Sequence, residues 1–231
     1  MGLVGAYVVF GLVGMKMRHE RIEATRKNNL IQIARAFLNY HNKCKHFPPA
    51  FVADKSGKPM HSWRVLILEM MPDQHSQKVF QQYDLSKPWN SPGNLAAGAS
   101  APDFFLNPLS NTKSQNTSYM VITGPGTIFD GVTPGRLLEI TDGLSNTILV
   151  AEVDDSETNW MEPRDLNAEL IPYEVNASGK VKSIAGFRAE GAMVATADGA
   201  VHLLKADIPS ESLRRLIMRD DGQVIDNKYL K

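Results

Sequence analysis

The first 43 residues carry the longest continuous pattern of hydrophobic and polar positions in the chain. Residues 1–15 contain no charged side chain, and a charged stretch follows them without a break as far as Lys43. Within that stretch, apolar residues such as Leu30, Ile33 and Phe37 recur at three- and four-residue steps, the spacing of one helix face. The pattern predicts one long helix, apolar at its start and half-buried afterwards.

The apolar run leaves three interpretations open. Its 15 residues are fewer than the roughly 20 that a membrane span needs, but Lys16 and Met17 extend the run, because a lysine can lay its aliphatic stem along lipid. We expect residues 1–17 to anchor the chain in a lipid bilayer and residues 18–231 to form one domain. A cleaved signal peptide, for which no basic leading region is present, and a buried core helix are the alternatives.

Strands are expected later in the chain. The run at 119–123 and the nearly all-apolar run at 147–153 predict two strands, of which the second is central. Asp198-Gly199 stands between the runs 192–197 and 200–205, which predicts a hairpin with a two-residue type I′ turn. A long first helix followed by such strands indicates an α+β fold, with the N-terminal helix packed on an antiparallel β-sheet.

Shorter elements connect these parts. Ser62 is a candidate cap for a helix that extends to Met71, and turn-forming residues make 50–61 a loop. The remaining predictions are a helix at 74–82, a helix that begins at Pro209-Ser210 and a last edge strand at 223–225.

Composition narrows the function classes. Lysine plus arginine and aspartate plus glutamate both number 25, so no net charge favours nucleic acid as a partner. Cys44 is the only cysteine, which rules out an intrachain disulfide and fits both the cytoplasm and a bacterial envelope protein. No nucleophile elbow, phosphate loop or zinc motif is present, so we expect no catalysis and no cofactor.

Eight acidic residues lie between positions 139 and 165. Oxygen-rich loops suit Ca²⁺, but a solvated acidic rim and salt bridges to the basic helix explain the cluster as well. A hydrolase with paired carboxylates is the weakest alternative. If a metal binds, its expected ligands are Asp154, Asp155 and Glu157; in the competing hypothesis Arg164 and Arg188 neutralise these carboxylates.

The tryptophans stand beside polar side chains, and such pairs can line a pocket for a saccharide or another small solute. Tryptophans also anchor loops to a core, which is the alternative. The candidate ligand-binding residues are Trp63, Arg64, Trp89, Asn90, Trp160 and Glu162.

Several short strings occur together in order. They include Phe47-Pro48-Pro49-Ala50, His61-Ser62-Trp63-Arg64, Pro88-Trp89-Asn90, Gly124-Pro125-Gly126-Thr127, Asp142-Gly143-Leu144-Ser145-Asn146 and Ala197-Asp198-Gly199. The ordered set resembles the bacterial domain-of-unknown-function family 1559, also labelled solute-binding-protein-like, from about residue 18 to the end of the chain.

Members of this family look like type IV pilins and pseudopilins. The resemblance implies a protruding N-terminal helix on an antiparallel sheet, envelope or pilin-like partners, and no known activity. The chain departs from the family where Arg188 replaces a motif histidine, and where Arg26 and Asn107 replace cysteines that the family often carries. Met1-Gly2 opens directly into the apolar run without the basic leader of the family, which fits either a divergent member that never enters a pilus or a chain whose true start lies upstream.

The resemblance and the charges disagree about topology. Lys16, Arg18 and Arg21 follow the apolar run, and the positive-inside rule would keep the domain in the cytoplasm, whereas the family implies the outer side. We predict a single-pass inner-membrane protein with its domain on the periplasmic or extracellular side and a binding or assembly role. A saccharide- or solute-binding module is the alternative function.

Overall fold

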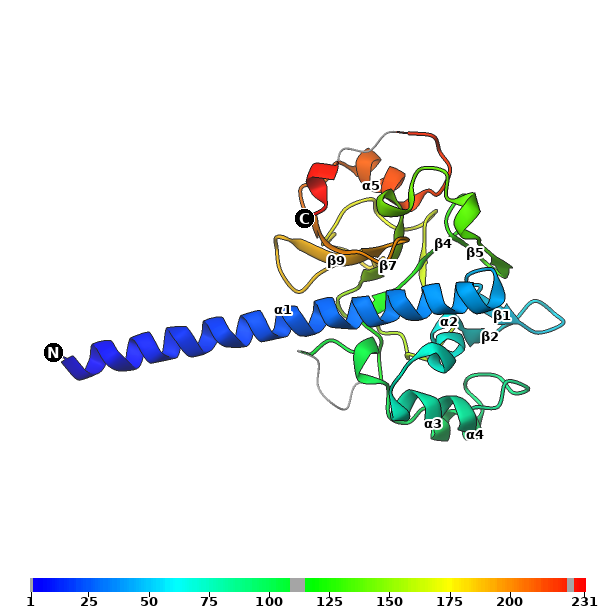
Figure 1. The fold of residues 1–231 in the computed structure, drawn as a ribbon, viewed down its shortest axis with the longest axis horizontal. Coiled ribbons are helices and arrows are strands. Elements are labelled where there is room, and N and C mark those ends of the chain that lie inside the picture. Colours follow the sequence, from blue (N-terminus) through cyan, green and yellow to red (C-terminus); the bar gives the residue numbers. More distant parts are fainter. Residues whose placement is uncertain (1, 109–114, 224–226) are drawn as a thin grey trace.

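Helix α1 (Gly2–Cys44) is the longest element of the protein. The structure, a computed structural model, describes residues 2–108, 115–223 and 227–231, with side chains from residue 14 onward except that of Asn227. In Figure 1, α1 crosses the domain with its C-terminal half, while its N-terminal half extends away from the domain. The predicted long helix, ending within one residue of Lys43, is therefore confirmed.

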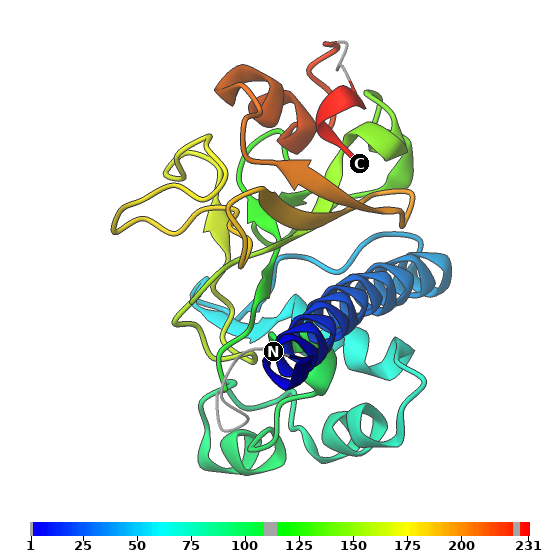
Figure 2. The same cartoon turned by 90° about the vertical axis from the view of Figure 1, so that its left-hand side faces the viewer.

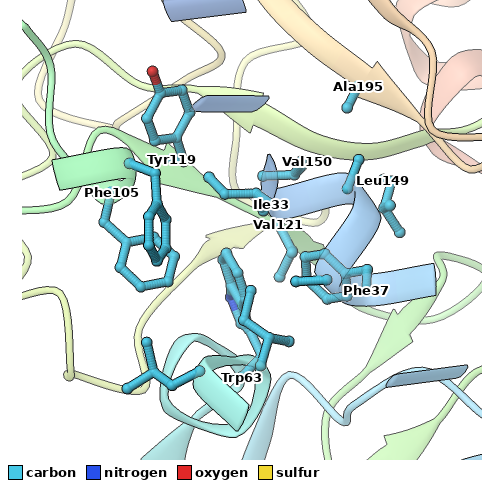
Figure 3. Close-up of a cluster of buried hydrophobic side chains, with 14 of the residues drawn as sticks. Ile33, Phe37, Trp63, Phe105, Tyr119, Val121, Leu149, Val150 and Ala195 are labelled. Atoms are coloured by element: carbon cyan, nitrogen blue, oxygen red, sulfur yellow. The ribbon is translucent and has the colours of Figure 1, made fainter. Parts of the chain in front are cut away.

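The C-terminal half of α1 buries one face completely. Leu30, Ile33, Ala34 and Phe37 have no exposed surface, and they follow the three- and four-residue steps of a helix face. Figure 3 shows Ile33 and Phe37 directed into a cluster that also contains Trp63. Each large side chain buried there contributes roughly 1.5–3 kcal/mol, so this face fixes the helix on the domain.

The main sheet has four antiparallel strands in the order β10-β9-β7-β3. Alternate residues of its strands point to opposite faces: Ala195 of β9 packs in the core with α1, whereas Val194 packs in a second core with α5. The sheet is therefore covered by a helix on each face. Its elements are β3 (Tyr119–Met120), β7 (Ile148–Glu152), β9 (Gly191–Thr196) and β10 (Val201–Lys205), with α5 (Ser210–Ile217).

A second four-stranded sheet has the order β6-β5-β4-β8 and is mixed. Strand β4 pairs in parallel with both β5 and β8, while β5 and β6 are antiparallel. Its strands are β4 (Ile122–Thr123), β5 (Phe129–Asp130), β6 (Thr133–Pro134) and β8 (Leu166–Asn167).

A mainly helical segment lies on the other side of α1. Seen along the axis of α1, the helix lies between this segment and the main sheet (Figure 2). The segment contains β1 (Phe51–Ala53), β2 (Pro59–Ser62), α2 (Trp63–Leu66), η1 (Ile67–Met70), α3 (Gln74–Gln82), α4 (Pro92–Ala97) and η2 (Asp103–Phe105). Three further 3₁₀ turns are η3 (Leu137–Glu139), η4 (Leu144–Asn146) and η5 (Asn227–Tyr229).

The predicted α+β class, with a long helix packed on an antiparallel sheet, is confirmed, but several local predictions need correction. The expected loop at 50–61 is a β1–β2 hairpin. The expected strand at 119–123 is divided at Val121, so that β3 joins the main sheet and β4 joins the mixed one. The predicted edge strand at 223–225 falls largely outside the described residues.

The β9–β10 hairpin is present as predicted, but its turn differs from type I′. Only Gly199 has a positive φ, +87°, whereas type I′ needs positive φ at both central residues. The Gly199 amide donates to Thr196 O at 2.9 Å, and the Thr196 amide donates to Ala200 O at 2.9 Å. This is a three-residue loop in which a turn is followed by a left-handed glycine.

Gly199→Val is expected to lower the melting temperature. A branched side chain at positive φ costs at least about 1–2 kcal/mol, and a Cβ here would lie 3.0 Å from Leu38 Cδ1 of α1. For a domain of this size we expect a fall of roughly 2–4 °C for each kcal/mol, measured by circular dichroism. Gly93→Val is the control, because nothing lies within 4 Å of its Cβ position; equal shifts in both variants would contradict the turn assignment.

Candidate functional site

The structure separates the six residues that the sequence proposed as a ligand pocket. Trp63, Arg64 and Trp160 have no exposed surface, whereas Trp89 is half-buried and Asn90 is exposed. The sixth residue, Glu162, is half-buried in the loop before β8. Because three of the six side chains are enclosed in the core, the set does not converge on one concave surface and does not form the expected saccharide pocket.

The two buried tryptophans anchor loops to the core instead. Trp160 donates from Nε1 to Gly98 O at 3.1 Å and stacks on Phe105 with ring centroids 5.7 Å apart. Gly98 leaves room for Trp160 and for the neighbouring Met161, since a Cβ there would lie 3.0 Å from Trp160 Cζ2 and 2.2 Å from Met161 Sδ. Trp63 packs on Phe37 of α1, with ring centroids 4.8 Å apart. The alternative in which the tryptophans fasten loops therefore accounts for both rings.

Arg64 and Asp165 form a buried ion pair at the junction of the two sheets. Arg64 Nη2 lies 2.6 Å from Asp165 Oδ1, and the two side chains are 0% and 2% exposed. Asp165 also accepts from Trp63 Nε1 and the Val121 amide, both at 3.1 Å. Arg64 donates further to Tyr119 O at 2.9 Å. The pair thus fixes α2, β3 and the start of β8 relative to one another.

Burial dominates the titration of this pair. Removal from water lowers the pKa of Arg64, although the charge of Asp165 opposes this shift. The same effect raises the pKa of Asp165, against the influence of Arg64 and of the Trp63 and Val121 hydrogen bonds. Each charge is therefore tolerated in the core because the other one is beside it.

The acidic cluster divides into an exposed part and a buried part. Asp154, Asp155 and Glu157 follow β7 on the surface, where Glu157 Oε2 lies 3.2 Å from Lys182 Nζ. Glu152 and Asp165 are enclosed and paired with arginines. The exposed residues fit the hypothesis of a solvated acidic rim. Glu152, which pairs with Arg26 of α1, fits the hypothesis of salt bridges to the basic helix, whereas Asp165 pairs with Arg64 of α2.

The expected neutralising arginines have other principal partners. Arg164 pairs with Glu162 at 3.1 Å, and Arg188 pairs with Glu23 of α1 at 2.9 Å. Within the described ranges, no three histidine, cysteine, aspartate or glutamate residues are grouped so that they could hold a metal ion. Asp154, Asp155 and Glu157 therefore do not form the predicted calcium site in this conformation.

A second buried ion pair holds α1 on the main sheet. Arg26 is 2% exposed and Glu152, the last residue of β7, is 0% exposed; Arg26 Nε donates to Glu152 Oε1 at 2.6 Å, and a second bond joins Nη2 to Oε2. Glu152 Oε2 also accepts from the Met193 amide of β9 at 2.8 Å, and Phe187 covers the guanidinium at 5.2 Å. Burial disfavours the charged form of Arg26. The hydrogen bond and the negative charge of Glu152 outweigh this effect, so the pKa of Arg26 is raised.

The sequence predicted salt bridges from the acidic cluster to the basic helix, but it did not single out Arg26 and Glu152 as partners. Arg26 stands at a position where the family often has a cysteine. One signal was present: Glu152 ends a strand whose other residues are apolar, and an unpaired carboxylate at such a position is costly. Its partner had to be a cation of another element, but the sequence did not say which.

On the N-terminal side of Arg26, α1 leaves the domain. Met15 and Met17 are 57% and 65% exposed, and a groove of about 350 Å³ runs between Ile22 and Phe187 where the helix emerges. Across the residues that the structure describes, no helix is long and apolar enough to cross a membrane. Most of the anchor predicted at residues 1–17 has side chains outside the described part of the chain.

Comparison with known proteins identifies one family. Residues 23–125 match the model of the family described as protein of unknown function (DUF1559), which supports the resemblance over this range. The strings after residue 125 lie beyond the matched range. No curated protein and no solved structure matches the chain.

Proposed function

We propose that this protein is a membrane-anchored, pilin-like protein of the bacterial envelope with a binding or assembly role and without catalysis. Its domain lies on the periplasmic or extracellular side of the inner membrane. The observation that carries the proposal is the division of α1, whose C-terminal half is packed in the domain while its N-terminal half projects from it.

The projecting half has the composition of an anchor. Residues 1–15 carry no charge, and residues 2–15 of α1 extend over about 21 Å at 1.5 Å per residue, against about 30 Å for the hydrocarbon core of a bilayer. Lys16 and Arg18 can extend toward the headgroups while their stems stay in lipid, and local thinning of the bilayer accommodates a short span.

The join between anchor and domain is rigid. Between Met17 and the first fully buried apolar residue, Leu30, the helix continues without a break, and the buried Arg26–Glu152 pair fastens it to the main sheet. A domain fixed to its anchor in this way keeps one orientation relative to the bilayer. That property suits a component that assembles laterally with other envelope proteins.

Fractionation of cells that express the full chain with a C-terminal tag tests the proposal. We expect the protein in the membrane fraction, where it resists an alkaline carbonate wash, and we expect protease to reach the domain from outside in spheroplasts. Val9→Lys with Leu12→Lys should release it, because each lysine at mid-membrane costs about 2.5–3.5 kcal/mol.

The control is Leu138→Lys, the same kind of substitution at a 94% exposed position of the domain, which should leave the fractionation unchanged. Recovery of the unsubstituted protein in the soluble fraction would overturn the anchor. Protection of the domain from external protease would overturn its placement on the outer side.

A further inference from the structure

The face of α1 that packs in the domain continues past the edge of the domain. The buried stripe that includes Leu30 extends toward the N-terminus at steps of four and three residues through Arg26, Ile22, Arg18 and Met15. The domain covers this face completely only as far as Arg26, since Ile22 is half-buried and the two residues before it in the stripe are exposed. A helix face directed like the buried one therefore lies uncovered where α1 emerges.

A loop of the domain borders this face and leaves a groove of about 350 Å³. The loop precedes β9 and contacts α1 twice. Arg26 Cζ lies 5.2 Å from the ring centroid of Phe187, and Arg188 Nη1 lies 2.9 Å from Glu23 Oε1. Asn176 holds the loop in turn, because its Nδ2 donates to Arg188 O at 2.9 Å. The loop is thus positioned against the helix by side-chain contacts on both sides of it.

Apolar side chains make up part of the lining. Met15, Ile22 and Phe187 line the groove, and among the described residues around it none is acidic. Met15 is 57% exposed, so apolar surface meets water here. Because burial of apolar surface is favourable, an occupant with an apolar part fits this groove better than an inorganic anion does.

Positive charge surrounds these apolar side chains. The lining also contains Arg18, Arg26 and Arg188, and Arg26 is paired with the enclosed Glu152. Arg188 pairs with Glu23, but the two side chains are 39% and 38% exposed, and water screens such a pair. Arg18 has no ion-pair partner among the side chains that the structure describes. Arg18 and Arg188 are therefore available to an anion.

The position of the groove indicates the source of that anion, and this step rests on the anchor proposed above. With residues 1–15 in the hydrocarbon layer, Arg18 and Ile22 lie about 4.5 Å and 10 Å beyond Met15 along the helix axis. The headgroup layer on each side of a bilayer is about 5–7 Å thick. The groove therefore lies at the level of the lipid phosphates.

We propose that this groove binds the headgroup of an anionic phospholipid. Arg18 and Arg188 donate to its phosphate, which matches the planar fork of a guanidinium group. The apolar side chains of the lining contact its glycerol and the first methylene groups of its chains. A zwitterionic headgroup carries a cation that the arginines repel, so the groove favours an anionic lipid. The binding also gives a role to basic residues on the outer side of the membrane, where the positive-inside rule disfavours them.

Lipid retention by the full chain tests the proposal. The protein is reconstituted into vesicles of phosphatidylglycerol and phosphatidylcholine in equal shares, extracted into a mild detergent and purified, and the lipids that stay bound are identified by mass spectrometry. We expect the ratio of phosphatidylglycerol to phosphatidylcholine to exceed that of the vesicles at least about fivefold, a difference of about 1 kcal/mol. A ratio equal to that of the vesicles would overturn the proposal.

Three variants locate the binding. Arg18→Gln with Arg188→Gln should bring the ratio close to that of the vesicles. Arg35→Gln with Lys58→Gln removes the same charge at exposed positions outside the groove and should leave the ratio unchanged. Ile22→Asn keeps every charge but should reduce the phosphatidylglycerol retained per chain, because the apolar contact is lost. Equal losses in the two double variants, or full retention by Ile22→Asn, would show a diffuse attraction of charges and contradict the groove.

Vesicles of phosphatidylcholine alone separate this proposal from the anchor. The anchor predicts that the full chain floats with these vesicles although no anionic lipid is present. Flotation together with an unaltered lipid ratio would contradict only the phospholipid site. Flotation solely with vesicles that contain phosphatidylglycerol would contradict the anchor and support the site, and no flotation with either composition would contradict both.

Discussion

Replacing Glu152 with alanine is expected to destabilise the domain by about 3–5 kcal/mol, because it leaves the Arg26 charge enclosed without a partner. The same change removes the acceptor of the Met193 amide, and a buried donor without an acceptor adds a cost of its own. Since a whole domain is stable by only about 5–15 kcal/mol, the loss is a large share of the total. Urea denaturation followed by circular dichroism measures it.

An exposed ion pair of the same helix provides the control. Lys43 Nζ lies 2.6 Å from Glu69 Oε1, and these side chains are 55% and 42% exposed. Glu69→Ala is expected to cost less than about 1 kcal/mol, because water screens such a pair. Equal losses in Glu152→Ala and Glu69→Ala would contradict the role of burial.

A double variant distinguishes loss of the pair from loss of packing. Arg26→Met together with Glu152→Leu replaces both charges by apolar side chains of similar volume. Such replacements of buried ion pairs are often neutral or stabilising, so we expect the double variant to recover most of the stability that Glu152→Ala loses. The Met193 amide stays without its acceptor, which sets the limit of the recovery.

The long helix and the central strand were predictable because each repeats one local pattern over many residues. The stripe of Leu30, Ile33 and Phe37 specifies a helix without reference to any other part of the chain. The apolar run at β7 specifies a buried strand in the same way. The hairpin was predictable from Asp198-Gly199, although the loop length was not, because the dipeptide fits both a two- and a three-residue loop.

The mixed sheet was not predictable because its strands have only two residues each. Two residues carry no detectable alternation, and the parallel pairing of β4 with β8 joins segments that lie more than 40 positions apart. The division at Val121 has a specific cause in Asp165, whose Oδ1 accepts from the Val121 amide. A side-chain acceptor there replaces a strand partner, and local sequence does not reveal it.

The candidate residues were misjudged for a related reason. Trp63 and Arg64 are adjacent and amphipathic, and either a pocket or a core is consistent with that composition. The deciding fact is the position of Asp165, which accepts from both side chains at once.

Asp165→Ala is expected to have the largest effect of any single substitution considered for this chain. It leaves the Arg64 charge without a partner at 0% exposure, which costs about 3–5 kcal/mol. It also removes the acceptor of Trp63 Nε1 and of the Val121 amide, at about 1–3 kcal/mol for each enclosed donor. The sum approaches the whole stability of a domain, so the variant should be largely unfolded at 37 °C, as measured by near-ultraviolet circular dichroism and susceptibility to trypsin.

Two companion variants identify the cause. Asp165→Asn keeps the shape and one acceptor oxygen, so it should retain a folded domain that is less stable than the unsubstituted protein but more stable than Asp165→Ala. Glu162→Ala removes a carboxylate from the same loop, where Glu162 forms an ion pair with the 54% exposed Arg164, and should change stability by less than about 1 kcal/mol. If Asp165→Ala remained folded with a melting temperature close to that of Glu162→Ala, the buried pair would not be what joins α2, β3 and β8. A melting temperature for Asp165→Asn midway between the two alanine variants would show that the charge of Asp165 contributes together with its shape and hydrogen bonding, because the asparagine side chain keeps the shape and one acceptor oxygen but not the charge.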